Sequence, residues 1–154
     1  MSKPQYCLEI EGIQVSCEGE QLRDILYKLD ILLEDLQLTW YAADVLPNIT
    51  PKKFPKWGEF SLCKIGTTQE LRRWCVLVSQ FDAGVFLAYP KGSFPVEGIE
   101  IGTEDEKFRD MNNAYLEIRA FDVTCYEIFT NDYDLLTLLK CYYGGELSEN
   151  PSQK

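Results

Sequence analysis

The chain has 154 residues and a formal net charge of −10, with 15 Lys and Arg against 25 Asp and Glu. This length suits one domain with a sizeable core, and a composition of 45% hydrophobic and 26% charged residues excludes disordered and collagen-like chains. No run approaches the ~18 apolar residues of a membrane span and the start does not resemble a signal peptide, so we expect an acidic cytoplasmic domain.

Residue patterns in the first half predict strands around one long helix. The alternating segments 6–10 and 13–16 indicate a hairpin or two edge strands. Leucines and isoleucines at spacings of three and four predict a helix over 20–36, followed by a strand over 38–45. Prolines at 47, 51 and 55 then predict an irregular loop over 46–58.

The second half repeats this alternation of helices and strands. Thr67 and Glu70 have the spacing of a capping box, which predicts a helix from there to about residue 80. An apolar run predicts a central strand over 84–89, and the acidic segment 104–110 is expected to be a short helix or a mobile stretch.

The C-terminal third contains the clearest pattern in the chain. Residues 115–121 and 125–129 alternate on either side of a tight turn, which predicts a hairpin. Asn131 or Asp132 is placed to cap a helix that ends near residue 143. The complete order predicts one α+β domain over 1–147, a mainly antiparallel sheet with about three helices on one face, and a frayed tail over 148–154.

The absence of histidine limits the chemistry that the chain can perform. Ser-His-Asp and Cys-His nucleophile systems, and zinc sites with histidine ligands, all require an imidazole. The six cysteines, none in a Cys-x-x-Cys pair, are Cys7, Cys17, Cys63, Cys75, Cys125 and Cys141. We interpret them as reduced, mostly buried thiols, and we expect no metal, no cofactor and no enzymatic activity.

The negative charge is concentrated at the two ends of the sequence, whereas residues 51–95 are net positive. Residues 52–57 join three lysines to Phe54 and Trp57, a combination found in single-strand nucleic-acid binders. We favour a solvated loop whose aromatic rings cover the core, because the overall charge repels phosphates. Neither a nucleic acid nor a membrane is therefore expected as a partner.

Residues 116–132, followed by Leu135, Leu136 and Leu139, resemble the endings of small bacterial immunity proteins of polymorphic toxin systems and relatives with the same hairpin–helix ending. The resemblance extends over about residues 115–143. It implies an acidic, single-domain, cytoplasmic protein without enzymatic activity that binds a toxin domain.

Two functional hypotheses follow. The first is an acidic inhibitor or immunity-type protein that occludes a basic protein partner through Glu104, Asp105, Glu106 and Asp110, with exposed aromatic side chains as anchors. The alternative is a small-molecule-binding or enzymatic domain with a cleft near Trp40, Tyr41 and Asp44, since a carboxylate at a strand end beside aromatic rings is a candidate site residue. A subunit of a larger assembly is a third possibility and would expose a large apolar patch.

Overall fold

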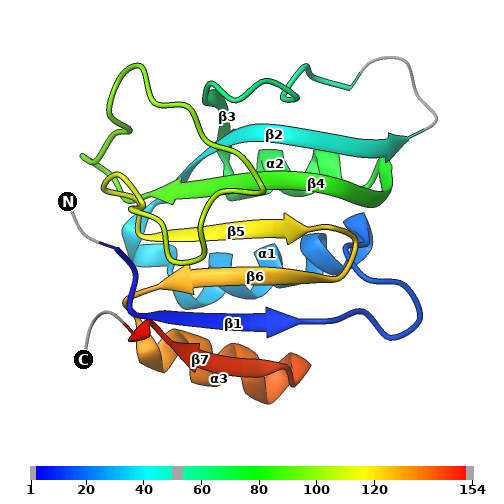
Figure 1. The fold of residues 1–154 in the computed structure, drawn as a ribbon, viewed down its shortest axis with the longest axis vertical. Coiled ribbons are helices and arrows are strands. Elements are labelled where there is room, and N and C mark those ends of the chain that lie inside the picture. The colour runs from blue at the N-terminus through cyan, green and yellow to red at the C-terminus, as the bar shows by residue number, and fades with distance from the viewer. Residues whose placement is uncertain (1–2, 50–53, 152–154) are drawn as a thin grey trace.

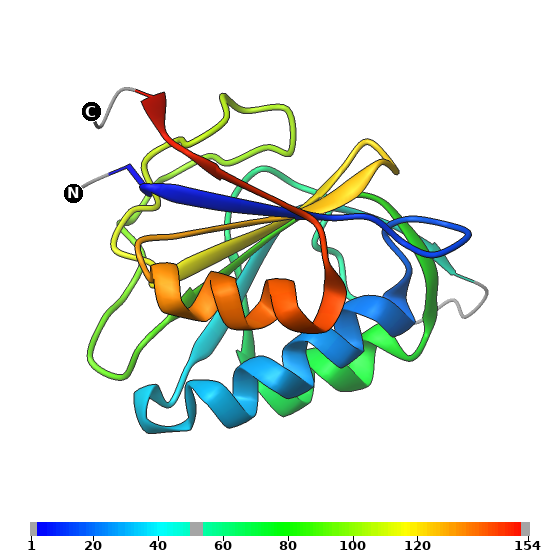
Figure 2. The same cartoon turned by 90° about the horizontal axis from the view of Figure 1, so that it is seen from below.

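The computed structural model describes residues 3–49 and 54–151, which form a seven-stranded sheet and three α-helices. Every strand pair is antiparallel, and the spatial order is β3-β2-β4-β5-β6-β1-β7 (Figure 1). Figure 2 shows all three helices on one face of this sheet and an extended connection on the other. The expected α+β architecture is confirmed.

The strands are β1 (Tyr6–Ile10), β2 (Thr39–Ile49), β3 (Cys63–Thr67), β4 (Val78–Tyr89), β5 (Leu116–Phe121), β6 (Cys125–Thr130) and β7 (Glu146–Glu149). The helices are α1 (Gly19–Leu32), α2 (Thr68–Cys75) and α3 (Tyr133–Tyr143), and a 3₁₀ turn, η1 (Glu34–Leu36), follows α1. Among the described helices, none is both long and apolar enough to cross a bilayer.

The main core lies between the sheet and the helices because strand residues alternate between the two faces. On β5, Leu116, Ile118 and Ala120 belong to this core, while Glu117 and Arg119 alternate with them in sequence and point to the opposite face. The helix predicted over 20–36 is confirmed as α1 and η1, and the leucine-rich face of α1 is buried. The C-terminal hairpin and α3 are confirmed as well, with the Asp132 carboxylate accepting from Leu135 N at 3.0 Å.

The predicted N-terminal hairpin is wrong. Residues 13–16 form bends, and the Ile13 side chain is fully exposed. β1 instead pairs with β6 on one side and β7 on the other, so its partners come from the far end of the chain. An alternating pattern indicates a strand but does not identify its partner, because pairing depends on the tertiary fold.

Two element boundaries differ from the prediction because β2 and β4 pair with each other from end to end. α2 ends at Cys75 rather than near residue 80, since Val78 already pairs with Ile49. β2 continues through Pro47 into the predicted loop. Pro47 is tolerated there because β3 pairs with β2 only over residues 39–42, so the outer edge of β2 needs no ladder donor at this position. Within the predicted loop, Lys52 and Lys53 lie outside the described residues, while Phe54 and Trp57 cover the core as expected.

Strand pairing also extends beyond the domain boundary expected at residue 147. Ser148 and Glu149 belong to β7 and pair with β1. The Asn150 backbone N donates to Gln5 O at 2.7 Å, and its side-chain amide donates to Pro4 O at 3.1 Å. The two ends of the described chain are therefore joined, and residues 148–150 are part of the domain.

The capping box at the start of α2 is confirmed by reciprocal hydrogen bonds between Thr67 and Glu70. We expect Thr67→Ala to lower the free energy of unfolding by about 1 kcal/mol, because the Glu70 backbone N–H loses its acceptor. Urea denaturation of Thr67→Ser, which retains the hydroxyl, is expected to give a value close to that of the native chain. Equal stability of the alanine and serine variants would contradict this role.

Candidate functional site

A long connection without regular structure covers the face of the sheet opposite the helices (Figure 2). We call this connection, residues 90–115 between β4 and β5, the strap. Residues 104–110, expected to be a short helix or a mobile stretch, form no helix; the strap consists of turns and one isolated bridge between Glu100 and Ser61. Ile101, Phe108 and Met111 are buried against the sheet and hold the strap in place.

A buried ion-pair triad fixes the strap to the centre of the sheet. The Glu117 carboxylate on β5 accepts from Arg119 Nε at 3.0 Å and, through its other oxygen, from Arg109 of the strap. The Arg119 guanidinium also donates to the backbone oxygens of Asp105, at 2.9 Å, and Glu106, at 3.4 Å. Glu117 and Arg119 are almost completely buried, so this network replaces the water that each charge would otherwise require.

Of the four acidic strap residues predicted to bind a partner, two are exposed to solvent and two bond to other strap residues. Glu104 and Glu106 are exposed, and Glu106 pairs with Lys3 at 3.4 Å. Asp105 accepts from Gly102 N at 2.9 Å and lies 3.3 Å from Arg109 Nε. Asp110 accepts from Asn112 N at 2.8 Å. Asp105 and Asp110 therefore stabilise the strap itself.

The predicted cleft residues do not share one pocket. Trp40 is fully buried on the helix face, where its indole N–H donates to Thr68 Oγ1 at 2.8 Å. Tyr41 lies on the opposite face, edge-on to Tyr89. Asp44 occupies a bulge of β2 with a φ of 51°, and its carboxylate accepts from Thr103 N at 2.8 Å. Asp44 thus anchors the strap.

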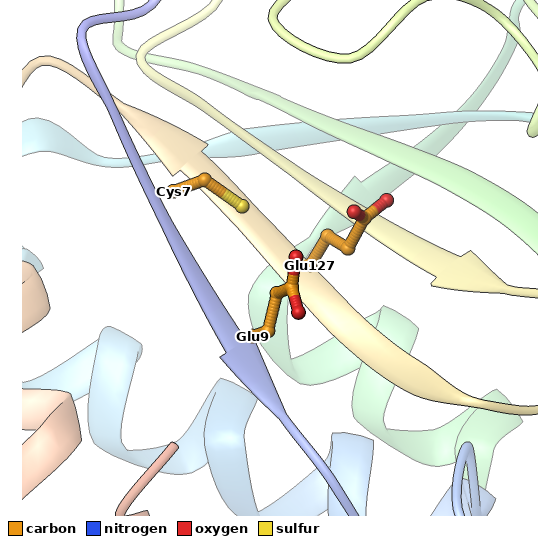
Figure 3. A group of neighbouring side chains, drawn as sticks. All are labelled: Cys7, Glu9 and Glu127. Carbon is orange, nitrogen blue, oxygen red and sulfur yellow. The ribbon is translucent and has the colours of Figure 1, made fainter. Parts of the chain in front are cut away.

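A row of glutamates crosses the strap side of the sheet. Glu127 on β6, Glu9 on β1 and Glu146 on β7 are direct cross-strand neighbours, so they project from the same face. Lys107 of the strap pairs with Glu9. Cys7 lies on the same face as Glu9, two residues earlier on β1 (Figure 3).

Burial is the largest influence on the pKa of Glu127 and of Cys7 in this cluster. It raises the pKa of the Glu127 carboxyl, and the nearby Arg119 and Lys107 only partly oppose it. Burial, followed by the negative charge of Glu127, raises the pKa of the Cys7 thiol far above its ordinary value. For Lys107, burial acts to lower the pKa, but the hydrogen bond to Glu9 and the surrounding negative charges outweigh it and raise the pKa. Cys7 is therefore a protonated thiol in this state and is not activated as a nucleophile.

A second feature lies on the opposite side of the molecule, where an open groove of about 700 Å³ runs between residues 11–18, α1 and the end of α3. Four carboxylates line the groove, together with exposed apolar and aromatic side chains. The carboxylates are Glu11, Glu18, Glu20 and Asp24, and the other side chains include Ile13, Val15, Tyr27 and Tyr142.

Two arginines, Arg23 and Arg72, also line the groove, and several of its polar side chains are paired with one another. Asp24 accepts from Tyr143 and from Lys28, and the tyrosine hydroxyl is the main cause of a lowered Asp24 pKa. Gln21 uses its amide N–H₂ to reach Glu11 O at 3.1 Å, and its Oε1 atom is buried without a hydrogen bond to any described residue. Lining tyrosines already accept cations over their rings, with Lys28 4.9 Å from the Tyr142 centroid and Arg72 4.9 Å from that of Tyr27.

Sequence reasoning did not identify the triad, the glutamate row or the groove. A usable signal was present for the first two: charged residues alternate with apolar ones in strands that are otherwise buried, as in Glu117 and Arg119 on β5. The groove had no comparable signal, because residues 11–18 and α3 are far apart in sequence.

Compared with known protein families, curated proteins and solved structures, the chain has no significant match.

The triad generates a stability prediction. Glu117→Gln removes the negative charge that two buried guanidinium groups share, so we expect the free energy of unfolding to fall by about 3 kcal/mol or more. Glu106→Gln, which breaks the exposed pair with Lys3 and leaves the Glu106 backbone acceptor in place, is expected to cost less than about 1 kcal/mol. Similar urea denaturation midpoints for the two variants would show that the triad does not secure the strap.

The raised pKa of Glu127 generates a prediction about pH. Its carboxyl favours the fold when protonated, and this contribution is lost as the pH rises from the ordinary value of 4.5 through the higher folded-state pKa. Glu127→Gln imitates the protonated form, so its stability advantage over the native chain is expected to grow with pH. Urea denaturation from about pH 4 to about pH 8 measures this difference. A difference that stays constant with pH would contradict the prediction.

Proposed function

We propose that this protein is a non-enzymatic interaction module, an acidic inhibitor or immunity-type protein of the cytoplasm that binds and occludes a basic protein partner. The groove between residues 11–18, α1 and α3 is its docking surface. The observation that carries the proposal is a groove in which four carboxylates, with two arginines among them, lie beside exposed apolar and aromatic side chains. A ligand that combines positive charge with apolar side chains matches both features.

The side chains beside the carboxylates favour a protein as this ligand. Ile13 and Val15 are exposed on the loop that forms one wall, and Tyr27 and Tyr142 are exposed on the helices opposite. Large apolar and aromatic anchors surrounded by charge are typical of protein interfaces. An arginine-containing segment has the matching chemistry, since a guanidinium group pairs with carboxylates and stacks on tyrosine rings.

The charge of the whole chain supports the same class of partner. A net charge of −10 attracts cationic surfaces and speeds their diffusional encounter, and this effect weakens as salt screens the field. Glu104 and Glu106 on the strap are exposed and add to this field on the other side of the sheet. Their contribution is therefore expected in the association rate, while the groove determines the lifetime of the complex.

Capture of the partner from native host lysate at low salt, followed by a salt gradient and mass spectrometry, is the first experiment. We expect one stoichiometric basic protein that elutes as salt increases. If no such protein is retained, the docking proposal is wrong.

Charge reversal then locates the interface. The groove variant Glu11→Lys/Glu20→Lys, the strap variant Glu104→Lys/Glu106→Lys and the control Asp30→Lys/Asp35→Lys carry the same net charge. We expect the groove variant to weaken binding at least tenfold through faster dissociation, whereas the other two only slow association. Surface-based kinetics at fixed ionic strength separate these rates. Faster dissociation of the strap variant instead would place the interface on the strap.

A further inference from the structure

Cys7, Glu9 and Glu127 form a compact group that the docking proposal does not use. One potential ligand atom from each residue, a sulfur and two carboxylate oxygens, lies within 4.8 Å of the others. Figure 3 shows the thiol and the two carboxylates projecting from β1 and β6 on the same side of the sheet. These donors come from rigid neighbouring strands, and such a scaffold holds them more accurately than a loop would.

The state of Glu127 is the second observation that points to a missing cation. Glu127 is only 5% exposed; Arg119 and Lys107 act on its charge through space, but neither of them, nor any other described residue, forms a hydrogen bond or an ion pair with its carboxylate. Its cross-strand neighbour Arg119 directs its guanidinium at Glu117 instead. Its other neighbour is Glu9, a like charge, and directly opposed like charges are destabilising. A buried carboxylate in this position gains most from a cation shared with Glu9.

A further polar atom beside the group lacks a partner. Ser148 on β7 is the cross-strand neighbour of Cys7, so it shares this face of the sheet. Its hydroxyl oxygen is buried and makes no hydrogen bond within the described part of the chain. A hydroxyl next to a thiol is suited to bond a thiolate or a water molecule held by a metal ion.

The net charge of the side chains beneath the strap is also compatible with a bound divalent cation. Apart from Glu146, which is exposed on the edge strand β7, the ionisable groups gathered there are four carboxylates, Glu9, Asp105, Glu117 and Glu127, and three cations, Lys107, Arg109 and Arg119. With every carboxyl ionised, one negative charge is left over. A divalent cation bound together with ionisation of the Cys7 thiol neutralises the whole cluster.

We propose that Cys7, Glu9 and Glu127 form a binding site for a single zinc-class divalent cation. A thiolate selects zinc over magnesium or calcium, and carboxylates are ordinary zinc ligands. Tetrahedral ligands at zinc bond lengths lie about 3.5 Å apart, so side-chain rotation has to bring the three atoms together by about 1 Å. Three protein ligands leave a fourth position open for water.

Entry to the site lies on the side of Glu9, whose side chain is 32% exposed, while Cys7 is fully buried behind it. Lys107 lies on this side, where it pairs with Glu9 Oε1. The second Glu9 oxygen can still bind the metal ion, but the positive charge of the Lys107 ammonium repels that ion. Lys107 therefore competes with the metal for the cluster.

Zinc chloride added to the chelator-treated full-length protein provides the direct test, with isothermal titration calorimetry as the readout. We expect one ion per chain and an increase in Tm on binding. Cobalt chloride supplies a second readout, because a thiolate–cobalt bond gives a charge-transfer absorption band that carboxylate binding does not produce. Absence of stoichiometric zinc binding would overturn the proposal.

Substitutions assign the ligands. We expect Cys7→Ser to abolish the cobalt–thiolate band, and Glu127→Gln, which keeps the side-chain shape, to weaken zinc binding at least tenfold. The matched controls are Cys141→Ser, at an exposed cysteine on α3, and Glu106→Gln on the strap, and both should bind as the native chain does. Lys107→Gln is expected to tighten binding several-fold. Zinc affinity unchanged by Glu127→Gln, or a cobalt band that persists in Cys7→Ser, would overturn the proposed ligand set.

Because Cys7→Ser alters a buried position, its fold is checked by circular dichroism before titration. The outcome is independent of the docking proposal, since partner binding is assigned to the groove on the helix side. A chain that binds zinc but no basic partner, or the reverse, distinguishes the two.

Discussion

The buried bonds from Arg109 and Arg119 to Glu117 are the constraint on which the strap side of this protein depends. Charges at the centre of a sheet are costly unless each one is paired, and here the partners come from a connection that has no secondary structure of its own. The strap is fixed in position because its Arg109 pairs with the buried Glu117 carboxylate. The sheet also provides the apolar surface on which Ile101, Phe108 and Met111 of the strap are buried.

This arrangement gives the two faces of the sheet different chemistry. The face towards the helices is apolar and supplies the cohesion of the domain. The strap face combines two smaller apolar clusters with ionisable groups, and burial raises the pKa of several of them. The proposed cation site belongs to this second face, and the proposed docking groove opens on the first.

Both proposals rest on the same physical imbalance. In the groove, Glu11, Glu18 and Glu20 form no ion pair with another described residue, and in the glutamate row the Glu127 carboxylate forms neither a hydrogen bond nor an ion pair with any described residue. Buried polar groups in folded proteins are nearly always satisfied, so exceptions indicate where a further molecule or ion belongs. The excess of acidic residues in the composition is therefore concentrated at two places in the structure, the groove and the glutamate row.

The sequence by itself determined the local elements: the leucine face of α1, the Thr67–Glu70 capping box, the C-terminal hairpin and the Asp132 cap all depend on residues within a few positions of one another. It also established the acidic charge and the absence of histidine. Tertiary structure decided what depends on distant partners. β1 pairs with β6 and β7 instead of residues 13–16, and β2 continues through Pro47 because it pairs with β4. Cys7 and Glu127 met only because long-range pairing, which local pattern does not encode, placed β1 beside β6.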